Sequence, residues 1–225
     1  MNRRRPNRTQ ATSALSNLHD YGIFMQSREI FLCSSADEDN GIDHKVAATF
    51  IKNLKLLESV NSDPITIHQY SIGGDQGAGF AIYDAIKNSD CKFIYICYGY
   101  AASMGSIIPQ AVVGKGIRVT QPNCEWTIHE GSACFDGTTK QVISNAEALK
   151  RSRNMMYEIY NRACKGGSFF RGKTLEEIKN VIKRRLNAKE DWIIYGDEAV
   201  KYGFADGVYG KGKYKSVEHI KDRIE

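Results

Sequence analysis

The sequence has few of the features that stabilise small secreted domains or direct a chain out of the cell. Its six cysteines are scattered, with no Cys-x-x-Cys pair, so neither a disulfide framework nor a zinc site is indicated. No apolar segment with a small-residue cleavage site follows the N-terminus, so no signal peptide is predicted. We therefore expect free thiols and a cytoplasmic location. An organelle lumen is the alternative, because the start of the chain resembles a transit peptide in composition.

One uncharged run is as long as a membrane span. It covers residues 93–113, which are 21 positions without Asp, Glu, Lys or Arg. Gly99, Ser103, Gly105 and Pro109 interrupt its apolar residues. The run therefore predicts a strand, a tight turn and a buried helix, and no membrane partner is expected.

Negative charge is missing from the start of the chain, where the first acidic residue is Asp20. Four arginines precede it: Arg3, Arg4, Arg5 and Arg8. Excluding them lowers the formal net charge from +5 to +1, so no nucleic-acid-binding face is expected. The 225 residues fit one domain with a sizeable core. We expect residues 1–19 to form a flexible basic arm, 20–210 the folded domain and 211–225 a charged tail.

Strand-like and helical patterns alternate along the domain. Five runs predict strands: Glu29–Cys33, Ile65–Ser71, Phe93–Cys97, Ile117–Thr120 and Trp126–His129. Helical periodicity covers residues 46–57, 142–163 and 175–186, and the pair Thr174 and Glu177 forms a capping box before the last of these. Strands separated by helices need crossover connections, so the sequence predicts an α/β fold with a mostly parallel, covered sheet.

Two turns of small residues each follow a predicted strand and precede a helix. One contains Gly73 and Gly74, and the other places Ser103 between alanine and glycine neighbours. Such a turn brings a side chain beside the free N–H groups of a helix N-terminus, which stabilise a developing anion. Ser103 is therefore a candidate nucleophile, and a helix cap is its alternative role. Neither a phosphate loop nor a GxGxxG pattern is completed, so nucleotide binding is not predicted.

A serine nucleophile needs a base, and the sequence offers five histidines. His129 is the best placed, because it ends a predicted strand just before a Gly-Ser loop, although a structural role is the alternative. The others lie in the arm, the tail, a helix start and the middle of a strand: His19, His219, His44 and His68. A carboxylate would hold the base in the required tautomer. Spacing alone leaves four candidates open: Asp136, Asp191, Asp197 and Asp206.

Three segments in the same order carry a family resemblance. They are GYAASMG at 99–105, the stretch from Pro122-Asn123 to Ile128-His129, and DWIIYGDEAVKYGFAD at 191–206. Together they resemble the ClpP family (peptidase family S14), the proteolytic subunits of ATP-dependent Clp proteases. The similarity runs from about Tyr21 to Tyr209. It implies the ClpP/crotonase-like fold with repeated ββα units and a protruding handle helix at Gln141–Cys164.

The resemblance also implies a mechanism and partners. Ser103 would be the nucleophile, His129 the general base and Asp191 the orienting acid, with the backbone amides of Gly74 and Met104 as the oxyanion hole. No metal or cofactor is implied, since ATP would act only through a partner AAA+ unfoldase. Seven copies would form each of two rings, a homo-oligomeric tetradecamer that cleaves unfolded polypeptides inside its chamber.

Several positions depart from the pattern of this family. They are Ile72 in place of a proline, Glu130-Gly131 in place of the common Gln-Pro, and the longer connection 165–172. In addition, Thr66 and His68 stand where the family often offers tyrosines to its ATPase. A phage-type maturation protease without an ATPase and a non-catalytic ring subunit therefore remain alternatives. The acyl-CoA hydratase branch of the crotonase fold is a further one, but it has no need of this triad.

Overall fold

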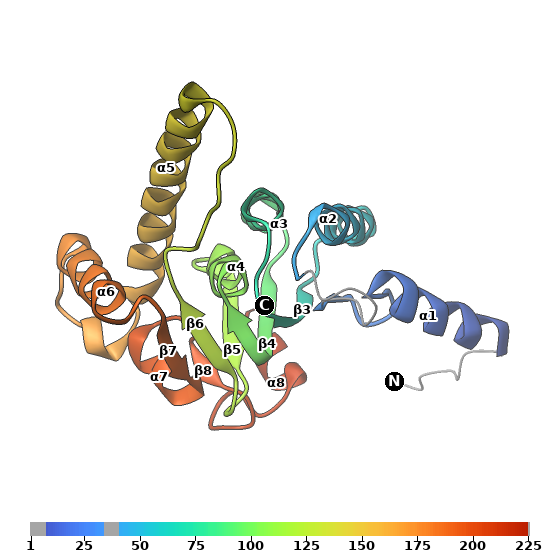
Figure 1. The fold of residues 1–225 in the computed structure, drawn as a ribbon. Helices are drawn as coiled ribbons and strands as arrows, with labels where there is room; N and C mark the ends of the chain where they lie inside the picture. The colour runs from blue at the N-terminus through green and yellow to red at the C-terminus, as the bar shows by residue number, and fades with distance from the viewer. Residues whose placement is uncertain (1–7, 34–40, 225) are drawn as a thin grey trace.

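A computed structural model describes residues 8–33 and 41–224 of the chain, and in this part an eight-stranded sheet forms the centre of the molecule (Figure 1). The strands are β1 (Ile23–Phe24), β2 (Glu29–Cys33), β3 (Ile65–Ser71), β4 (Phe93–Ala102), β5 (Gly116–Thr120), β6 (Glu125–Ile128), β7 (Trp192–Tyr195) and β8 (Gly207–Val208). Their order is β1-β2-β3-β4-β5-β8, with β6 pairing to β4 and β7 to β6. Only the β1–β2 and β6–β7 pairs are antiparallel among the pairs described. The predicted mostly parallel α/β fold is confirmed.

The helices in the described part of the chain are α1 (Arg8–Tyr21), α2 (His44–Glu58), α3 (Gln76–Asn88), α4 (Met104–Ile107), α5 (Thr139–Cys164), α6 (Leu175–Lys189), α7 (Gly196–Tyr202) and α8 (Val217–Lys221), with short 3-10 turns η1 (Ile108–Val112) and η2 (Ser168–Phe170). Helices α2, α3 and α4 lie between the consecutive parallel strands β2, β3, β4 and β5 and supply their crossovers. The capping box predicted at Thr174 and Glu177 opens α6. Figure 1 shows α2, α3 and α4 side by side on one side of the sheet.

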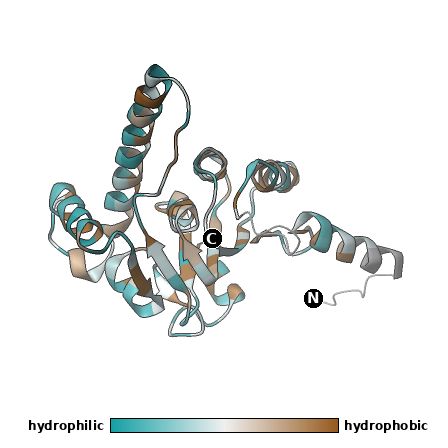
Figure 2. Ribbon diagram, viewed as in Figure 1, coloured by the Kyte–Doolittle hydropathy of each residue, from teal (hydrophilic) through white to brown (hydrophobic). Residues whose placement is uncertain are grey.

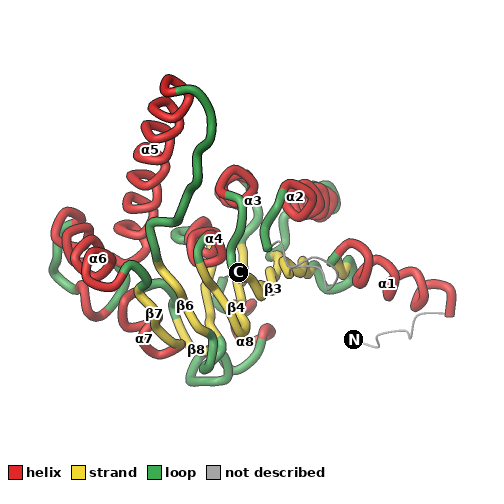
Figure 3. Tube along the Cα trace, in the orientation of Figure 1, coloured by secondary structure: helices red, strands yellow, loops and turns green. Residues whose placement is uncertain are grey.

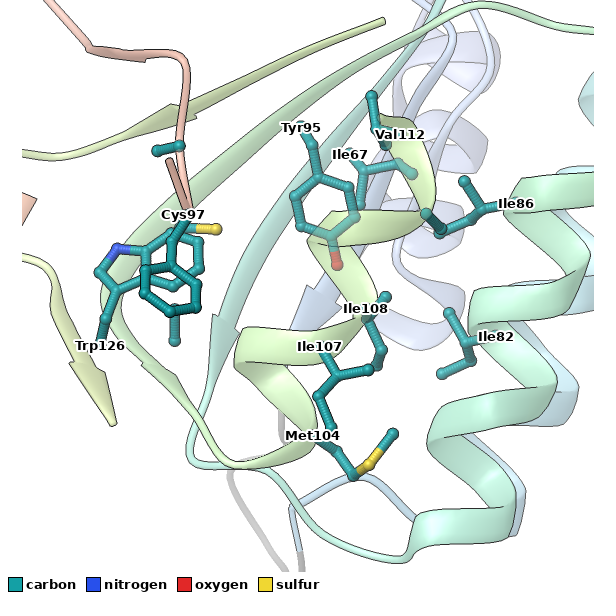
Figure 4. Packing of buried hydrophobic residues seen from close by; sticks show 14 of the residues in the cluster. Ile67, Ile82, Ile86, Tyr95, Cys97, Met104, Ile107, Ile108, Val112 and Trp126 are labelled. Atoms are coloured by element: carbon teal, nitrogen blue, oxygen red, sulfur yellow. The ribbon is translucent and has the colours of Figure 1, made fainter. Parts of the chain in front are cut away.

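The core lies on both faces of β4. Tyr95 and Cys97 belong to the core cluster on the face that α3 and α4 cover, to which Ile82 and Ile86 of α3 and Met104 of α4 also belong (Figure 4). On the opposite face, Ile94 and Ile96 pack against Tyr214, Ile220 and Ile224 near the C-terminus. Alternate residues of a strand point to opposite faces, so residues 93–97 of β4 are buried on both faces and form a continuous apolar run, whereas Gly99 and Tyr100 near its end are exposed.

Both predicted tails contain more structure than their sequences indicated. The region expected to be an irregular arm forms α1 from Arg8 onward, and this stretch of Ala, Leu and polar residues has no glycine or proline to break a helix. The predicted charged tail contains α8, whose Ile220 is fully buried. A few apolar residues among many charges were enough to dock it on the sheet. Residues 1–7 of the arm lie outside the described residues.

Helix α5 has two different halves. Its second half is packed on the domain, with Met156, Tyr160 and Ala163 buried, whereas residues 139–148 are all exposed. The exposed half projects from the body alongside the loop that leaves β6 (Figures 1 and 3). An apolar band near its free end interrupts an otherwise hydrophilic surface (Figure 2), where Val142 and Ile143 are exposed.

The uncharged run 93–113 forms β4, α4 and η1, which confirms the predicted strand, turn and helix. The strand continues through Gly99 to Ala102, however, and so extends beyond the predicted end at Cys97. No helix in the described ranges is long and apolar enough to cross a membrane. All six cysteines are free thiols, which confirms that prediction.

Candidate active site

Strand β4 delivers Ser103 to a sharp turn. The first half of β4 pairs with β5 and its second half pairs with β6. The end of β4 therefore lies inside the sheet, beside β6. Ser103 follows with φ 54° and ψ −125°, a left-handed conformation that is costly for a residue with a side chain. It occupies the position before α4 but its side chain makes no capping hydrogen bond. The hydroxyl is therefore not used as a helix cap.

The turn after β3 lies against this serine. A Cβ at Gly73 would lie 2.5 Å from the Ser103 Cβ and 2.8 Å from the Ala102 carbonyl oxygen, and Gly73 has φ +100°. Only glycine lacks the Cβ that would collide with these atoms and also adopts this positive φ readily. The Ser71 hydroxyl accepts a hydrogen bond from the Gly73 amide at 3.1 Å, which holds the turn closed. Two glycine-containing turns that lie far apart in the sequence thus form one site.

His129 and Asp191 meet at the other edge of the site. The Nδ1 atom of His129 lies 3.4 Å from the Asp191 carboxylate, and the two side chains are 29% and 55% exposed. The antiparallel pairing of β6 with β7 brings them together, because Ile128 lies opposite Trp192. The Nε2 atom of His129 is buried and has no hydrogen-bond partner among the described residues, Ser103 included.

The three other candidate acids lie elsewhere. Asp136 is exposed in the segment between β6 and α5. Asp197 pairs with Lys211 at 3.1 Å, and Asp206 pairs with the buried Arg118 at 2.5 Å. These contacts leave Asp191 as the carboxylate adjacent to the candidate base.

A pocket of about 510 Å³ joins the two edges of the site. Ser103 and His129 line it together, and so do Gly74 and Met104. Its apolar wall consists of side chains from α4 and α5: Ile107, Leu149 and Met156. A cavity of this size with a few convergent polar groups is typical of a binding site.

The amides of Gly74 and Met104 have no acceptor among the described residues. The backbone bridge between Ile42 and Gly74 consists of two hydrogen bonds, one from the Ile42 N–H to the Gly73 carbonyl and one from the Asp75 N–H to the Ile42 carbonyl, both at 2.7 Å. The Gly74 amide takes part in neither. Met104 is the first residue of α4, where amides have no partner within the helix. Both N–H groups therefore remain available to an oxygen in the pocket.

The sequence reasoning did not identify the cluster that joins the base to α5. The carboxylate of Glu130 accepts a hydrogen bond from the Arg153 guanidinium at 3.0 Å and another from the Tyr157 hydroxyl. Burial and this carboxylate raise the pKa of Tyr157, so its hydroxyl keeps the proton it donates. An arginine within the apolar stripe of the predicted handle was the sequence signal that could have pointed to this contact.

Two comparisons with known proteins found similar sequences. The family model described as Clp protease matches residues 12–212. An ATP-dependent Clp protease proteolytic subunit of Deinococcus radiodurans is 31% identical over 189 residues, which cover 84% of this chain and 83% of the relative.

Proposed function

The chain belongs to the Clp protease family, and we propose that it is a serine endopeptidase in which Ser103 is the nucleophile, His129 the general base and Asp191 the orienting acid. The observation that carries the proposal is the pocket that Ser103 and His129 share with the amides of Gly74 and Met104. The residue types match the known requirements of acyl transfer: a hydroxyl, an imidazole, a carboxylate and two free N–H donors.

The chemistry follows from these positions. The Ser103 Oγ forms a bond to the scissile carbonyl carbon while His129 Nε2 takes the hydroxyl proton. The carbonyl electrons move onto the oxygen, which the Gly74 and Met104 amides stabilise. Collapse of this intermediate breaks the C–N bond, and His129 returns its proton to the leaving amine. Water then hydrolyses the acyl-enzyme by the same steps.

Asp191 acts on the base through the Nδ1 atom of His129. A carboxylate 3.4 Å from Nδ1 favours the tautomer with its proton there, so Nε2 is left as the proton acceptor. Nε2 has no other partner in the described chain and is free for this role. We expect the Ser103 hydroxyl to come within hydrogen-bond reach of Nε2 when substrate binds, since catalytic hydrogen bonds often tighten only in the complex.

We extend the proposal to the substrate and the assembly. The apolar pocket wall of Ile107, Leu149 and Met156 suits a medium-sized apolar side chain of an unfolded polypeptide. The relative from Deinococcus radiodurans is a proteolytic subunit of an ATP-dependent protease by name. By analogy, this chain assembles into rings around a chamber and receives substrate from an AAA+ unfoldase.

A fluorophosphonate probe tests the catalytic proposal. The probe should label Ser103, with labelling lost in Ser103→Ala and strongly reduced in His129→Ala. Ser106 is a poor competitor, because it is fully buried and its hydroxyl donates to the Ser103 carbonyl at 2.7 Å. Labelling that survives Ser103→Ala would refute this assignment of the nucleophile. Wild-type protein that neither reacts nor cleaves peptides would favour the non-catalytic ring subunit.

One observation favours the maturation protease as a second candidate. His68 stacks on Phe31 with 4.5 Å between ring centroids, and its Nδ1 lies 2.9 Å from the Tyr98 hydroxyl. A histidine tied into a polar network therefore stands where the family often places a docking tyrosine. Degradation of a folded substrate only with an AAA+ unfoldase and ATP would decide against this candidate. Processing of one partner protein without ATP would support it.

A further inference from the structure

The geometry of Ser106 and Tyr160 points to a positioning device for the oxyanion hole: we propose that these two buried residues set the direction of the Met104 N–H by fixing the Ser103 carbonyl. The inference rests on the proposed function, in which the Met104 amide receives the oxyanion. Neither residue touches substrate, so both act through the peptide between Ser103 and Met104.

The peptide bond between Ser103 and Met104 is planar. The carbonyl of Ser103 and the N–H of Met104 belong to one planar trans unit, so they point in opposite directions and rotate together. Any group that fixes the Ser103 carbonyl therefore also fixes the Met104 N–H. This control matters here because Ser103 has φ 54°, a conformation that persists only when surrounding contacts hold it.

Ser106 donates two hydrogen bonds to this carbonyl. Its backbone amide donates to the Ser103 oxygen at 2.8 Å and its hydroxyl donates to the same oxygen at 2.7 Å. Two donors occupy both lone pairs of the carbonyl, which restrains the peptide plane in two directions. Ser106 is fully buried, so water cannot substitute for either donor.

Tyr160 of α5 fixes the Ser106 hydroxyl in turn. The two hydroxyl oxygens lie 2.7 Å apart, and a serine hydroxyl has one proton, which Ser106 already donates to Ser103. Tyr160 must therefore be the donor to Ser106. Its ring is fully buried and packs edge-on against Phe204, so the hydroxyl has a fixed position. The resulting chain runs from Tyr160 through Ser106 to the Ser103 carbonyl.

The second oxyanion donor is oriented in the same way by backbone alone. The Gly73 carbonyl accepts from the Ile42 amide at 2.7 Å, and the Gly74 N–H belongs to that same peptide unit. This hydrogen bond joins backbone atoms alone, so no side-chain substitution removes one of its partners. The Met104 amide, in contrast, depends on two hydroxyls, which makes its orientation accessible to mutation.

The test compares Ser106→Ala and Tyr160→Phe with matched controls. A fluorogenic peptide with leucine before its coumarin amide reports kcat and KM. The corresponding peptide leucinal forms a hemiacetal with the Ser103 Oγ, so its carbonyl oxygen occupies the oxyanion hole. The peptide leucinol cannot form this adduct and reports ground-state binding alone. Native mass is measured for every variant, and rates are compared for the assembled protein.

We expect Ser106→Ala to lower kcat by about 10- to 100-fold, somewhat less than the loss of a whole donor. Affinity for the leucinal should fall by a similar factor, while KM and leucinol affinity stay within about twofold. Tyr160→Phe should show the same pattern at about 3- to 10-fold, because Ser106 keeps its own bonds.

The controls remove a hydroxyl contact far from the site. Ser89→Ala loses an acceptor for the Cys91 amide at 3.2 Å, and Tyr98→Phe loses the contact with His68. Both should lower the melting temperature without changing the ratio of leucinal to leucinol affinity.

Each outcome separates the inference from the function it rests on. Unchanged kcat and leucinal affinity in Ser106→Ala and Tyr160→Phe, with Ser103→Ala inactive, would overturn the inference and leave the peptidase intact. Equal losses for leucinal and leucinol would also overturn it, since they indicate general distortion of the pocket. Activity that persists in Ser103→Ala would instead refute the proposed function. If Ser106→Ala fails to fold, Tyr160→Phe decides alone, because it retains the buried ring.

Discussion

The two edges of the candidate site are built in contrasting ways. The turn at Ser103 is enclosed: Met104, Gly105 and Ser106 are all buried, the Ser103 amide donates to the Thr127 carbonyl, and the Ser103 carbonyl accepts two hydrogen bonds from Ser106. The edge at His129 is open, because its side chain and that of Asp191 are 29% and 55% exposed and the following residues 131–148 are all exposed. In the proposed mechanism, the chain therefore completes the oxyanion side by itself and leaves the acid–base side uncovered.

The contrast indicates which part of the site depends on assembly. Strain near Ser103 is tolerated because the surrounding buried contacts hold the turn in this conformation. An exposed carboxylate, in contrast, orients an imidazole weakly, since water competes for both groups. In the proposed ring, a neighbouring copy would exclude that water. Substitutions at the two edges should therefore differ in their effects.

Removal of the base should have the largest effect. His129→Ala leaves Ser103 without a proton acceptor, so kcat should fall by about 10⁴-fold or more. A peptidase assay of the assembled variant measures this loss. His219→Ala, which loses an exposed contact with Ser216 at the start of α8, is the matched control and should retain full activity. Equal activity in both variants would remove His129 from the mechanism.

A methyl group in the enclosed turn should come next. Gly73→Ala places a Cβ 2.5 Å from that of Ser103, and displacement of the nucleophile should lower kcat on the order of 10²-fold. Gly114→Ala is its control, because Gly114 has φ +84° with nothing within 4 Å of the added Cβ. That variant should lose only the conformational cost of about 1 kcal/mol in unfolding free energy and no activity. Full activity in Gly73→Ala would contradict the close approach of the two turns.

A charge at the exposed end of α5 should weaken the contact between rings and thereby affect the edge of the site at His129. Ile143 is 55% exposed in the half of α5 that does not pack on the domain. If this end joins two rings, Ile143→Asp should halve the native mass and lower the peptidase rate by several-fold, about 1 kcal/mol in the barrier. Native mass spectrometry measures the first effect. Unchanged mass would place the ring contact elsewhere.

The smallest effect is expected outside both edges. The contact with His68, whose Nε2 lies 3.5 Å from the Glu29 carboxylate, is the main cause that lowers the pKa of Glu29 below its ordinary value of 4.5. A lowered pKa in the folded state stabilises the protein above the unfolded pKa, and this contribution is lost as pH falls through the folded value. Glu29→Gln should therefore lower the free energy of unfolding by less than about 1 kcal/mol near neutral pH, and the difference should vanish in acid. Urea unfolding at both pH values measures it, and a pH-independent difference would contradict this cause.

Sequence patterns were sufficient for the elements that carry the site. The alternation of strand and helix patterns predicted β3, β4 and β6, and small residues around Ser103 predicted the turn. The choice of Asp191 over three other aspartates came from family resemblance, because the pairing of β6 with β7 that brings it to His129 is not visible in local spacing.

Long-range contacts were beyond prediction. Ser106 and Tyr160 are 54 positions apart, and no periodicity relates a serine inside a turn to a tyrosine on a distant helix. Likewise, α8 docks through Ile220 in a segment whose composition is mainly charged. In both cases the contact forms because the residues are buried, and their burial depends on the whole fold.

A crystal structure of the peptide leucinal adduct would show whether the two amides receive the oxyanion. We expect a bond from the leucinal carbon to Ser103 Oγ, with the hemiacetal oxygen about 2.7–3.1 Å from the amides of both Gly74 and Met104. His129 Nε2 should lie within hydrogen-bond reach of the adduct. An adduct on another side chain, or a hemiacetal oxygen directed away from both amides, would contradict the proposed mechanism.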